Sequence, residues 1–369
     1  LSNQVPRRYC EDFVLVNVFS IVNEPYKCEH IVPKSLNAVL YWFYIHKMFS
    51  RSSLLFALLA LNILYGIFLA AFLLLGDNTV MKKRFVSQTK QQVFVPTLPA
   101  LRQIFTEDHS WTATLSANRK RILLATGDII PGRSVNFQTV HRGDFTWPYQ
   151  QTADVLRNAD ITFINLESPL IANCPLTQEG MIFCGDARNV KGLIFGGVDI
   201  ASLANNHAGN HGAVGVDDTK ELLQTNGIRV TGIDGAEVID IRGIKFAFLG
   251  YNDITKPQPG ITNVDEEKIK SDIIQAKKKA DIVVVTYHWG VEYRNQPDER
   301  QKYLGHFTID AGADVVIGNH PHWIQPIEIY KDKFITYAHG NFIFDQEWSL
   351  KTKQGVVGRY TFYDKQLID

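Results

Sequence analysis

An excess of charge of either sign is missing from this 369-residue chain, which holds 38 basic and 38 acidic residues. Proteins that bind nucleic acids electrostatically carry a basic patch or stripe, and neither that nor a zinc-finger or RNA-binding signature is present. Internal repeats and low-complexity tracts are lacking too. With 45% hydrophobic and 21% charged residues, the chain can bury a sizeable core and is not of disordered composition. The sequence therefore predicts a globular protein without a nucleic-acid partner.

Cysteine is scarce, with four residues in the whole chain. Cys10 and Cys28 lie near the start, and Cys174 and Cys184 bracket a short loop. A disulfide between the second pair would suit an oxidising exterior, whereas two free thiols would carry no such implication. The sequence leaves both alternatives open.

One long apolar run is present at residues 54–75, where no charge occurs and Asn62 is the most polar residue. A helix of this length, at about 1.5 Å per residue, spans roughly 33 Å and could cross a bilayer. A buried core helix or a cleaved signal peptide is the alternative, but core helices rarely stay apolar on all faces. We expect an uncleaved signal anchor at 52–76, hence a single-pass cell-membrane protein. Flanking basic residues do not decide its orientation, and the second cysteine pair favours an extracytoplasmic C-terminal domain.

The rest of the chain divides into three parts that differ in composition and motif content. Residues 1–51 carry no motif, and a start at Met48 would leave most of them outside the native product. Residues 77–117 are polar and predict a linker or stalk. Residues 118–369 form the expected domain, and we expect it to be truncated by one strand at the C-terminus.

Within that domain, short runs rich in β-branched residues alternate with amphipathic stretches. The predicted strands are 122–126, 161–165, 199–206, 245–251, 281–290, 314–320 and 334–341. The predicted helices are 216–226, 265–280 and 298–311. This alternation predicts an α/β domain with a parallel or mixed sheet.

All but one of the predicted strands end in polar side chains, where ligands of open α/β sheets bind. The residues singled out are Asp128, Glu167, Asn205, Asn206, His207, His288, Glu292, His320, His322 and Asn341. Each alone has a structural explanation, such as a helix cap, a solvated carboxylate, a turn or a core histidine. Together they predict one polar site.

His320 and His322 are the sharpest part of this pattern. Alternation in an extended segment would place both rings on one side, and the intervening proline would stiffen it. Neutral histidine is the commonest metal ligand, and a set of oxygen and nitrogen donors without thiolate suits Mn, Zn or Fe. A shared carboxylate could bridge two ions about 3.5–4 Å apart. Arg133 could face an anionic group there, or form a surface salt bridge.

At these residues the chain resembles the bacterial capsule-synthesis family of CapA type, which is linked to poly-γ-glutamate. The stretches that carry the resemblance are GDIIPGR, ADITFINLESPL, VDIASLANNHAGNHG, HWGVEY, AGADVVIGNHPHWIQPIEIY and FITYAHGNFIFD. They occur in the family's order and cover about residues 120–365.

That family is similar in turn to calcineurin-like metallophosphoesterases. The resemblance implies a layered α/β sandwich of metallophosphoesterase-like type, with helices outside two sheets and one or two divalent ions (Mn, Zn or Fe). By motif position, the implied metal ligands are Asp128, Glu167 as a bridging carboxylate, Asn206, His288, His320 and His322. His207 matches the proton donor of an Asn-His pair, and Arg133 joins it as a catalytic residue.

The chain departs from the phosphoesterase pattern at Ile130, where that pattern has a histidine. One metal subsite thereby loses a ligand, which puts a full dinuclear centre and phosphatase activity in doubt. Within the CapA-type family the absence is expected.

The resemblance implies a membrane-anchored protein of poly-γ-glutamate or capsule polymer synthesis and export. Its partners would be other capsule-synthesis membrane proteins and an anionic polymer. The alternatives are a metal-dependent phosphoesterase of unknown substrate and a non-catalytic polymer-binding scaffold. Ile130 speaks against the first alternative, and His207, which a structural metal site would not need, speaks against the second. Whether the protein is a hydrolase is left open.

Overall fold

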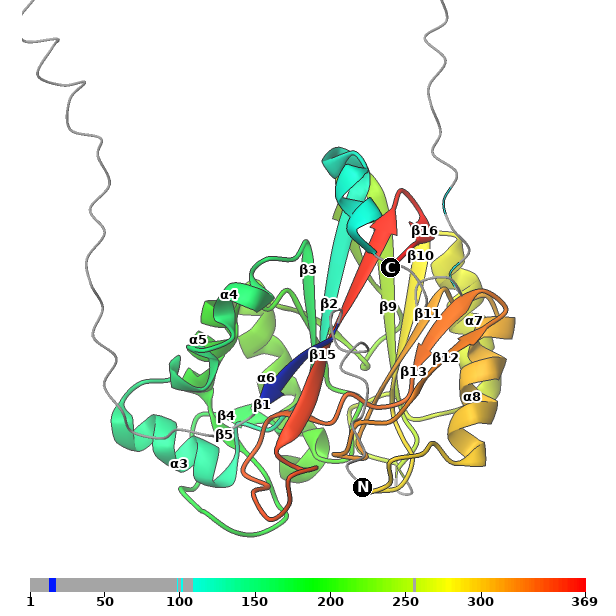
Figure 1. The fold of residues 1–369 in the computed structure, drawn as a ribbon. Helices are drawn as coiled ribbons and strands as arrows, with labels where there is room; N and C mark the ends of the chain where they lie inside the picture. The colour runs from blue at the N-terminus through cyan, green and yellow to red at the C-terminus, as the bar shows by residue number, and fades with distance from the viewer. Residues whose placement is uncertain (1–12, 18–97, 99–100, 102–108, 255–256) are drawn as a thin grey trace, which may run out of the picture. The chain divides into compact units, whose positions relative to one another are not determined.

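The computed structural model describes residues 13–17, 98, 101, 109–254 and 257–369. Two β-sheets pack face to face, and helices cover the outer side of each (Figure 1). The α/β class predicted from the alternation of strands and helices is confirmed, and the layers follow the order helix, sheet, sheet, helix.

The first sheet has eight strands, six of them in the order β1-β15-β2-β3-β6-β7, with β14 beside β2 and β16 beside β15. Strands β2, β3, β6, β7 and β14 are parallel, whereas β15 runs antiparallel to both β1 and β2. Their bounds are β1 (Phe13–Asn17), β2 (Lys120–Ile129), β3 (Ile161–Leu166), β6 (Ile200–Ser202), β7 (Arg229–Thr231), β14 (Asn341–Ile343), β15 (Gln354–Tyr363) and β16 (Gln366–Leu367).

The second sheet has six strands in the order β12-β13-β11-β10-β9-β8. Its four inner strands are parallel, and β8 and β12 are antiparallel edges. The bounds are β8 (Glu237–Ile241), β9 (Ile244–Asn252), β10 (Ile282–His288), β11 (Val315–Asn319), β12 (Ile327–Tyr330) and β13 (Lys333–Thr336). A separate two-stranded sheet pairs β4 (Leu170–Ile171) with β5 (Gly185–Asp186).

Helices α3 to α6 lie beside the first sheet, and α7 and α8 cover the second (Figure 1). Their bounds are α3 (Arg133–Arg142), α4 (Ala153–Leu156), α5 (Val190–Gly196), α6 (Gly212–Thr225), α7 (Glu266–Lys277) and α8 (Glu299–Asp310). Helix α8 starts at a capping box between Asp298 and Gln301, as its sequence indicates. Helix α6 begins four residues before its predicted start. The prediction missed this first turn because Gly212 and the small residues after it show no apolar periodicity.

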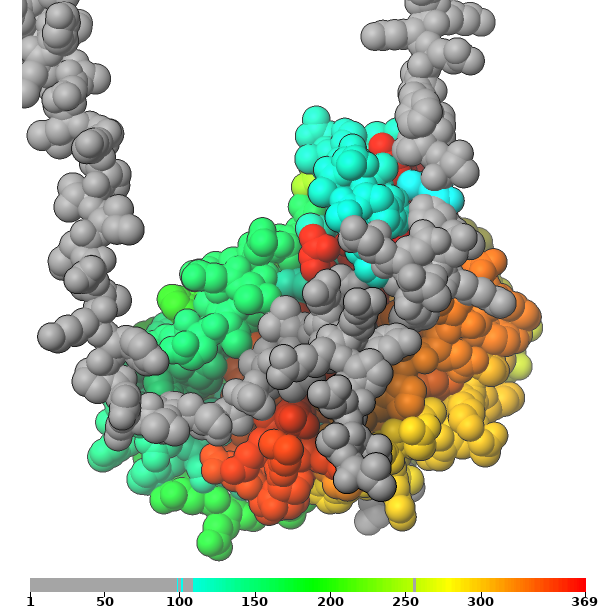
Figure 2. All heavy atoms as spheres, viewed as in Figure 1, coloured from blue at the N-terminus to red at the C-terminus, as the bar shows by residue number. Residues whose placement is uncertain are grey.

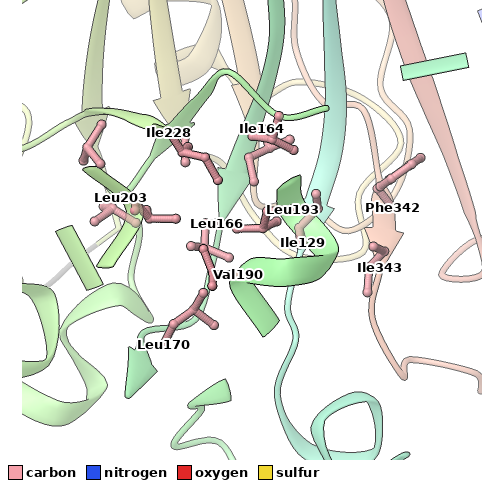
Figure 3. Close-up of a cluster of buried hydrophobic side chains, with 14 of the residues drawn as sticks. Ile129, Ile164, Leu166, Leu170, Val190, Leu193, Leu203, Ile228, Phe342 and Ile343 are labelled. Atoms are coloured by element: carbon pink, nitrogen blue, oxygen red, sulfur yellow. The ribbon is translucent and has the colours of Figure 1, made fainter. Parts of the chain in front are cut away.

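The strands are apolar on both faces because both faces are covered. On β3, Phe163 packs between the sheets with Phe248 and Val284 of the second sheet. Its neighbour Ile164 points the other way, into the layer under the helices that also holds Leu193 (Figure 3). Burial on both sides accounts for the continuous apolar runs by which these strands are recognisable in the sequence.

We expected a single-pass membrane protein with a transmembrane helix and an extracytoplasmic C-terminal domain. The lengths of the helices in the described part of the chain contradict this expectation. Within the described ranges no helix is both long and apolar enough to cross a membrane. The longest, α6, has 14 residues and at about 1.5 Å per residue reaches roughly 21 Å, short of the roughly 30 Å of a hydrocarbon core. The apolar run 54–75 lies outside the described residues, as do most of the predicted N-terminal segment and linker.

Cys174 and Cys184 form a disulfide, which decides between the two alternatives that the sequence left open. Cys184 directly precedes β5, so the bond fastens the loop 174–184 to the small two-stranded sheet. The neighbouring residue Phe183 is buried, and its amide donates a hydrogen bond to Asn210. The disulfide therefore fastens an otherwise exposed loop at its buried end, beside Phe183.

Replacing both cysteines, as Cys174→Ala with Cys184→Ala, should lower the free energy of unfolding by about 2–3 kcal/mol, because the cross-link restricts the unfolded chain. Urea denaturation under non-reducing conditions measures the difference. Adding a thiol reductant to the wild-type protein should remove most of it. Equal stability of the two proteins without reductant would contradict the structural role of this bond.

Candidate metal site

The site is built where strands of both sheets end. In the first sheet, Asp128 on β2 is in register with Asn165 on β3 and with Asn341 on β14. In the second, His288 at the end of β10 is in register with Asn319 at the end of β11. The carboxyl ends of parallel strands share one edge, so the polar residues at these ends come together there.

Three other donor atoms of this region converge around the Nε2 atom of His288. It lies 2.7 Å from Asn206 Oδ1, 3.1 Å from His320 Nδ1 and 3.2 Å from Glu167 Oε1. Ligands about 2.0–2.2 Å from a common zinc-like ion are separated from one another by about this much. Two imidazoles, an amide oxygen and a carboxylate thus converge as the ligands of one ion would.

No hydrogen bond among the described residues stabilises the charge of Glu167, although the nearby His322 favours it. It is completely buried, and both carboxylate oxygens lack a hydrogen-bond partner among the described residues. Its contact with His288 is not an ion pair, because burial lowers the pKa of His288 to about 3, although Asp128 opposes the shift. Burial also raises the pKa of Glu167 well above its usual range, and the charge of Asp128 raises it further. An unpartnered buried carboxylate beside neutral imidazoles fits a divalent cation, which would supply the missing charge.

A second set of donors, Asp128 and His322, shares Glu167 with the first set. His322 Nδ1 lies 3.3 Å from Asp128 Oδ2 and 2.8 Å from Asn341 Oδ1. Burial opposes ionisation of Asp128, but the contacts with His322 and His288 outweigh it and lower its pKa. Burial would lower the pKa of His322, but the charges of Glu167 and Asp128 dominate and raise it to about 9. Without a cation, His322 therefore carries the compensating proton.

Three overlapping groups of side chains offer ligand atoms within 4.8 Å of one another. The groups are Glu167, His288 and His320; Asp128, Glu167 and His322; and Glu292, His320 and His322. The structure thus brings together the residues expected as metal ligands, with Asn206 joined through His288, and adds Glu292. That they bind metal, and which metal, stays a prediction.

The backbone of the paired histidines, His320 and His322, has a different conformation from the extended one that we expected. His320 has φ = 101° and His322 has φ = 55°, so the segment is not an extended strand with alternating sides. Non-glycine residues with such positive φ angles are strained and cluster at functional sites. The ring of His320 stacks edge-on against His288, with centroids 4.8 Å apart.

Asn165 is a site residue that the sequence reasoning passed over. Its Nδ2 donates to Asp128 Oδ1 at 2.8 Å, and it lies 3.3 Å from His288 Nδ1. Its Oδ1 accepts a hydrogen bond from Asn205 at 3.2 Å. The Asn205 side chain in turn accepts from the amides of His207 and Ala208, which fixes the turn carrying Asn206. The signal was present, because Asn165 lies two residues before Glu167 at the end of the same strand.

His207 is buried at the edge of the site and is held by two neighbours. Its ring stacks on Phe183 at 4.1 Å, and its Nδ1 lies 2.9 Å from Asn210 Oδ1. That oxygen also accepts from the amide of Phe183, so the Nδ1 of His207 is the donor and its Nε2 the acceptor. Burial lowers the pKa of His207 to about 4, with Asn210 opposing the shift, and the ring is neutral at pH 7. In this state His207 accepts a proton before it can donate one.

Arg133 is neither free nor on the surface. It forms an ion pair with Asp345, and only 11% of its side chain is exposed. Its guanidinium lies 5.0 Å from the ring of Phe183 and 4.7 Å from that of Phe344. Ile130 completes the apolar cluster formed by these two rings. Phe183 contacts His207 and Phe344 contacts His322, so Arg133 lies one aromatic ring away from each histidine.

A layered α/β domain that gathers carboxylate, amide and imidazole donors at its strand ends defines a candidate metal-binding protein. The family model of the bacterial capsule synthesis protein PGA_cap matches residues 122–346, which is more than half of the chain. The chain therefore belongs to this family.

Two curated relatives support the assignment. The chain is 32% identical over 269 residues to the capsule biosynthesis protein CapA of Bacillus anthracis, covering 67% of this chain and 65% of the relative. It is 34% identical over 251 residues to the PGA biosynthesis protein CapA of Bacillus subtilis, covering 63% and 66%. The matched region thus spans slightly less than two thirds of each relative.

Among solved structures, the chain is similar to a hypothetical protein of Thermus thermophilus, with a TM-score of 0.45 and 16% identity, covering 67% of this chain and 96% of that one. It is also similar to a Mycoplasma pneumoniae protein described as a novel phosphatase, with a TM-score of 0.40 and 14% identity, covering 60% and 72%. At these values neither likeness bears on function.

The raised pKa of His322 makes metal binding depend on pH. Below pH 9 the metal-free ring is protonated, and an ion that binds it must displace the proton. The affinity for Zn²⁺ or Mn²⁺ should therefore rise at least about tenfold per pH unit between about pH 6 and pH 8, because a proton held by Glu167 would be released as well. Calorimetric titrations in buffers of different ionisation enthalpy measure the released proton.

The exposed His141 on α3 offers a matched control, since His141→Ala should keep the full pH dependence. His322→Asn should bind ions with a flatter dependence. An affinity of the wild-type protein that stays constant from about pH 6 to pH 8 would contradict the assigned protonation of His322.

Proposed function

We propose that this chain serves poly-γ-glutamate or capsule polymer synthesis and export through a divalent-metal site that hydrolyses or transfers an anionic substrate. The observation that carries the proposal is the completely buried carboxylate of Glu167, which lies among Asn206, His288 and His320 and has no hydrogen-bond partner in the part of the chain that the structure describes. Membership of the capsule-synthesis family supports the pathway, and the donor set supports the chemistry.

Glu167, Asn206, His288 and His320 would hold one ion, and Asp128 and His322 would add donors beside it in the group that shares Glu167. A bound divalent ion would polarise a carbonyl or phosphoryl oxygen of the substrate and make a coordinated water more acidic. Asn341 orients the ring of His322 by accepting its Nδ1–H, which leaves Nε2 for a ligand contact.

His207 would move a proton in this reaction. Its neutral ring is fixed by Asn210 and Phe183, with the acceptor atom Nε2 left for the reacting groups. Because its pKa is about 4, it takes a proton from an attacking group at neutral pH and returns it to the leaving group afterwards. This order differs from a histidine that starts the reaction as a proton donor.

Arg133 would recognise the anionic group of the substrate. Its guanidinium has a buried Nε without a hydrogen-bond partner among the described residues, while Asp345 and the carbonyl of Gly180 accept from its other nitrogens. The faces of Phe183 and Phe344 keep it desolvated, where a charge-assisted bond to carboxylate or phosphate is strong. The polymer and other capsule-synthesis proteins are the partners that this function requires.

His207→Ala should abolish turnover, by about 10²–10⁴-fold, because it removes the proton acceptor without removing a metal ligand. The assay uses poly-γ-glutamate and a generic aryl phosphate with the purified full chain, and elemental analysis is made on the same sample. His141→Ala should keep both activity and metal. A metal-loaded wild-type protein that turns over neither substrate would contradict the enzymatic proposal and leave polymer binding as the function.

A further inference from the structure

The donor group of Asp128, Glu167 and His322 receives no ligand from position 130, where the phosphoesterase pattern has a histidine and this chain has Ile130. Ile130 is fully buried in the apolar cluster with Phe183 and Phe344. No side chain at position 130 of this chain can therefore serve an ion near Asp128 and His322. With Glu167 shared between both groups, that region would be one protein ligand short.

A carboxylate reaches this region from the other sheet. The chain leaves β10 after His288 and turns at Gly290, where φ is +82° and an added Cβ would lie 2.5 Å from the side chain of Gln301. Two residues later, Glu292 offers an oxygen that lies within 4.8 Å of ligand atoms of both His320 and His322.

The loop that carries Glu292 is held in place on both sides. The amide of Trp289 donates to Asn319 O at 3.1 Å, and that of Tyr293 donates to Pro321 O at 2.8 Å. The Tyr293 hydroxyl accepts a hydrogen bond from Gln346 at 3.1 Å. These bonds tie the loop to the segment of the paired histidines, so Glu292 and the histidine rings share one rigid frame.

We infer that Glu292 completes a second cation subsite with Asp128, Glu167 and His322, in place of the histidine that is absent at position 130. The inference rests on the proposed metal-binding function and adds a second ion to it. His322 links the two donor groups, because it lies in the group with Glu292 and also in the group with Asp128 and Glu167.

The two subsites then differ in chemistry. The first offers two imidazoles, one amide oxygen and one carboxylate, a set that suits Zn²⁺ or Fe²⁺. With Glu292 added to Asp128, Glu167 and His322, the second would offer three carboxylates and one imidazole, and carboxylate-rich sites suit Mn²⁺ or Mg²⁺. A dinuclear centre with unlike subsites follows, where the sequence comparison with phosphoesterases alone would suggest a single ion.

The test is a titration of the metal-free full chain with Mn²⁺, read by calorimetry and by electron paramagnetic resonance. The wild-type protein should bind about two ions per chain, and their proximity of about 4 Å should give a spin-coupled spectrum. Glu292→Gln should keep the first ion and weaken the second by more than the roughly 10–100-fold typical of losing an outer-shell partner. Its spectrum should become that of an isolated Mn²⁺.

Glu299→Gln is the matched control, because Glu299 is an exposed acid at the start of α8 that pairs with Lys302. It should bind both ions like the wild type. Retention of the first ion in Glu292→Gln shows that this variant is folded.

The outcomes separate the two claims. A Glu292→Gln variant that binds two ions with unchanged affinity, or a wild-type protein that binds only one, would overturn the role of Glu292 and leave the proposed function standing. A wild-type protein that binds no ion would overturn both.

Discussion

A fully buried carboxylate without a hydrogen-bond partner is stable in one of two forms: protonated, or ionised against a cation. Glu167 is such a group among the described residues, and its neighbours are compatible with both the protonated and the ionised form. In the metal-free protein, burial raises the pKa of Glu167, and His322 carries a compensating proton. With a cation present, Glu167 can ionise and its charge is neutralised. The remaining features of the site can be understood as support for this exchange of protons for metal.

The fold supplies that support by bringing two sheets together at one edge. Asp128 is clamped where β2 meets β14, because its amide donates to Gly340 O at 2.9 Å. The approach is so close that a Cβ on the preceding residue, Gly127, would lie 2.2 Å from the same oxygen. His288 enters from the second sheet, where Trp289 is buried and donates to Tyr337 O. The apolar layers on both faces of each sheet hold these strand ends in fixed register.

Much of this arrangement could be predicted from the sequence because it follows from local patterns. Apolar runs ending in Asp128, Glu167, His288 and His320 indicate both the strands and the edge at which they meet. The ion pair of Arg133 with Asp345 could not be predicted, since it joins residues far apart in the chain through tertiary packing. The same holds for the pairing of β1 with β15. In the space-filling view, the red-orange segment before β15 lies between green and yellow segments (Figure 2).

The most direct test of the account is an X-ray diffraction experiment on crystals of the protein grown with Zn²⁺ or Mn²⁺ and measured on both sides of the absorption edge of the metal. The account predicts an anomalous peak about 2.0–2.3 Å from a Glu167 oxygen, Asn206 Oδ1, His288 Nε2 and His320 Nδ1. Absence of the peak, with Glu167 hydrogen-bonded to water or to a side chain instead, would contradict the central claim that this carboxylate is a metal ligand.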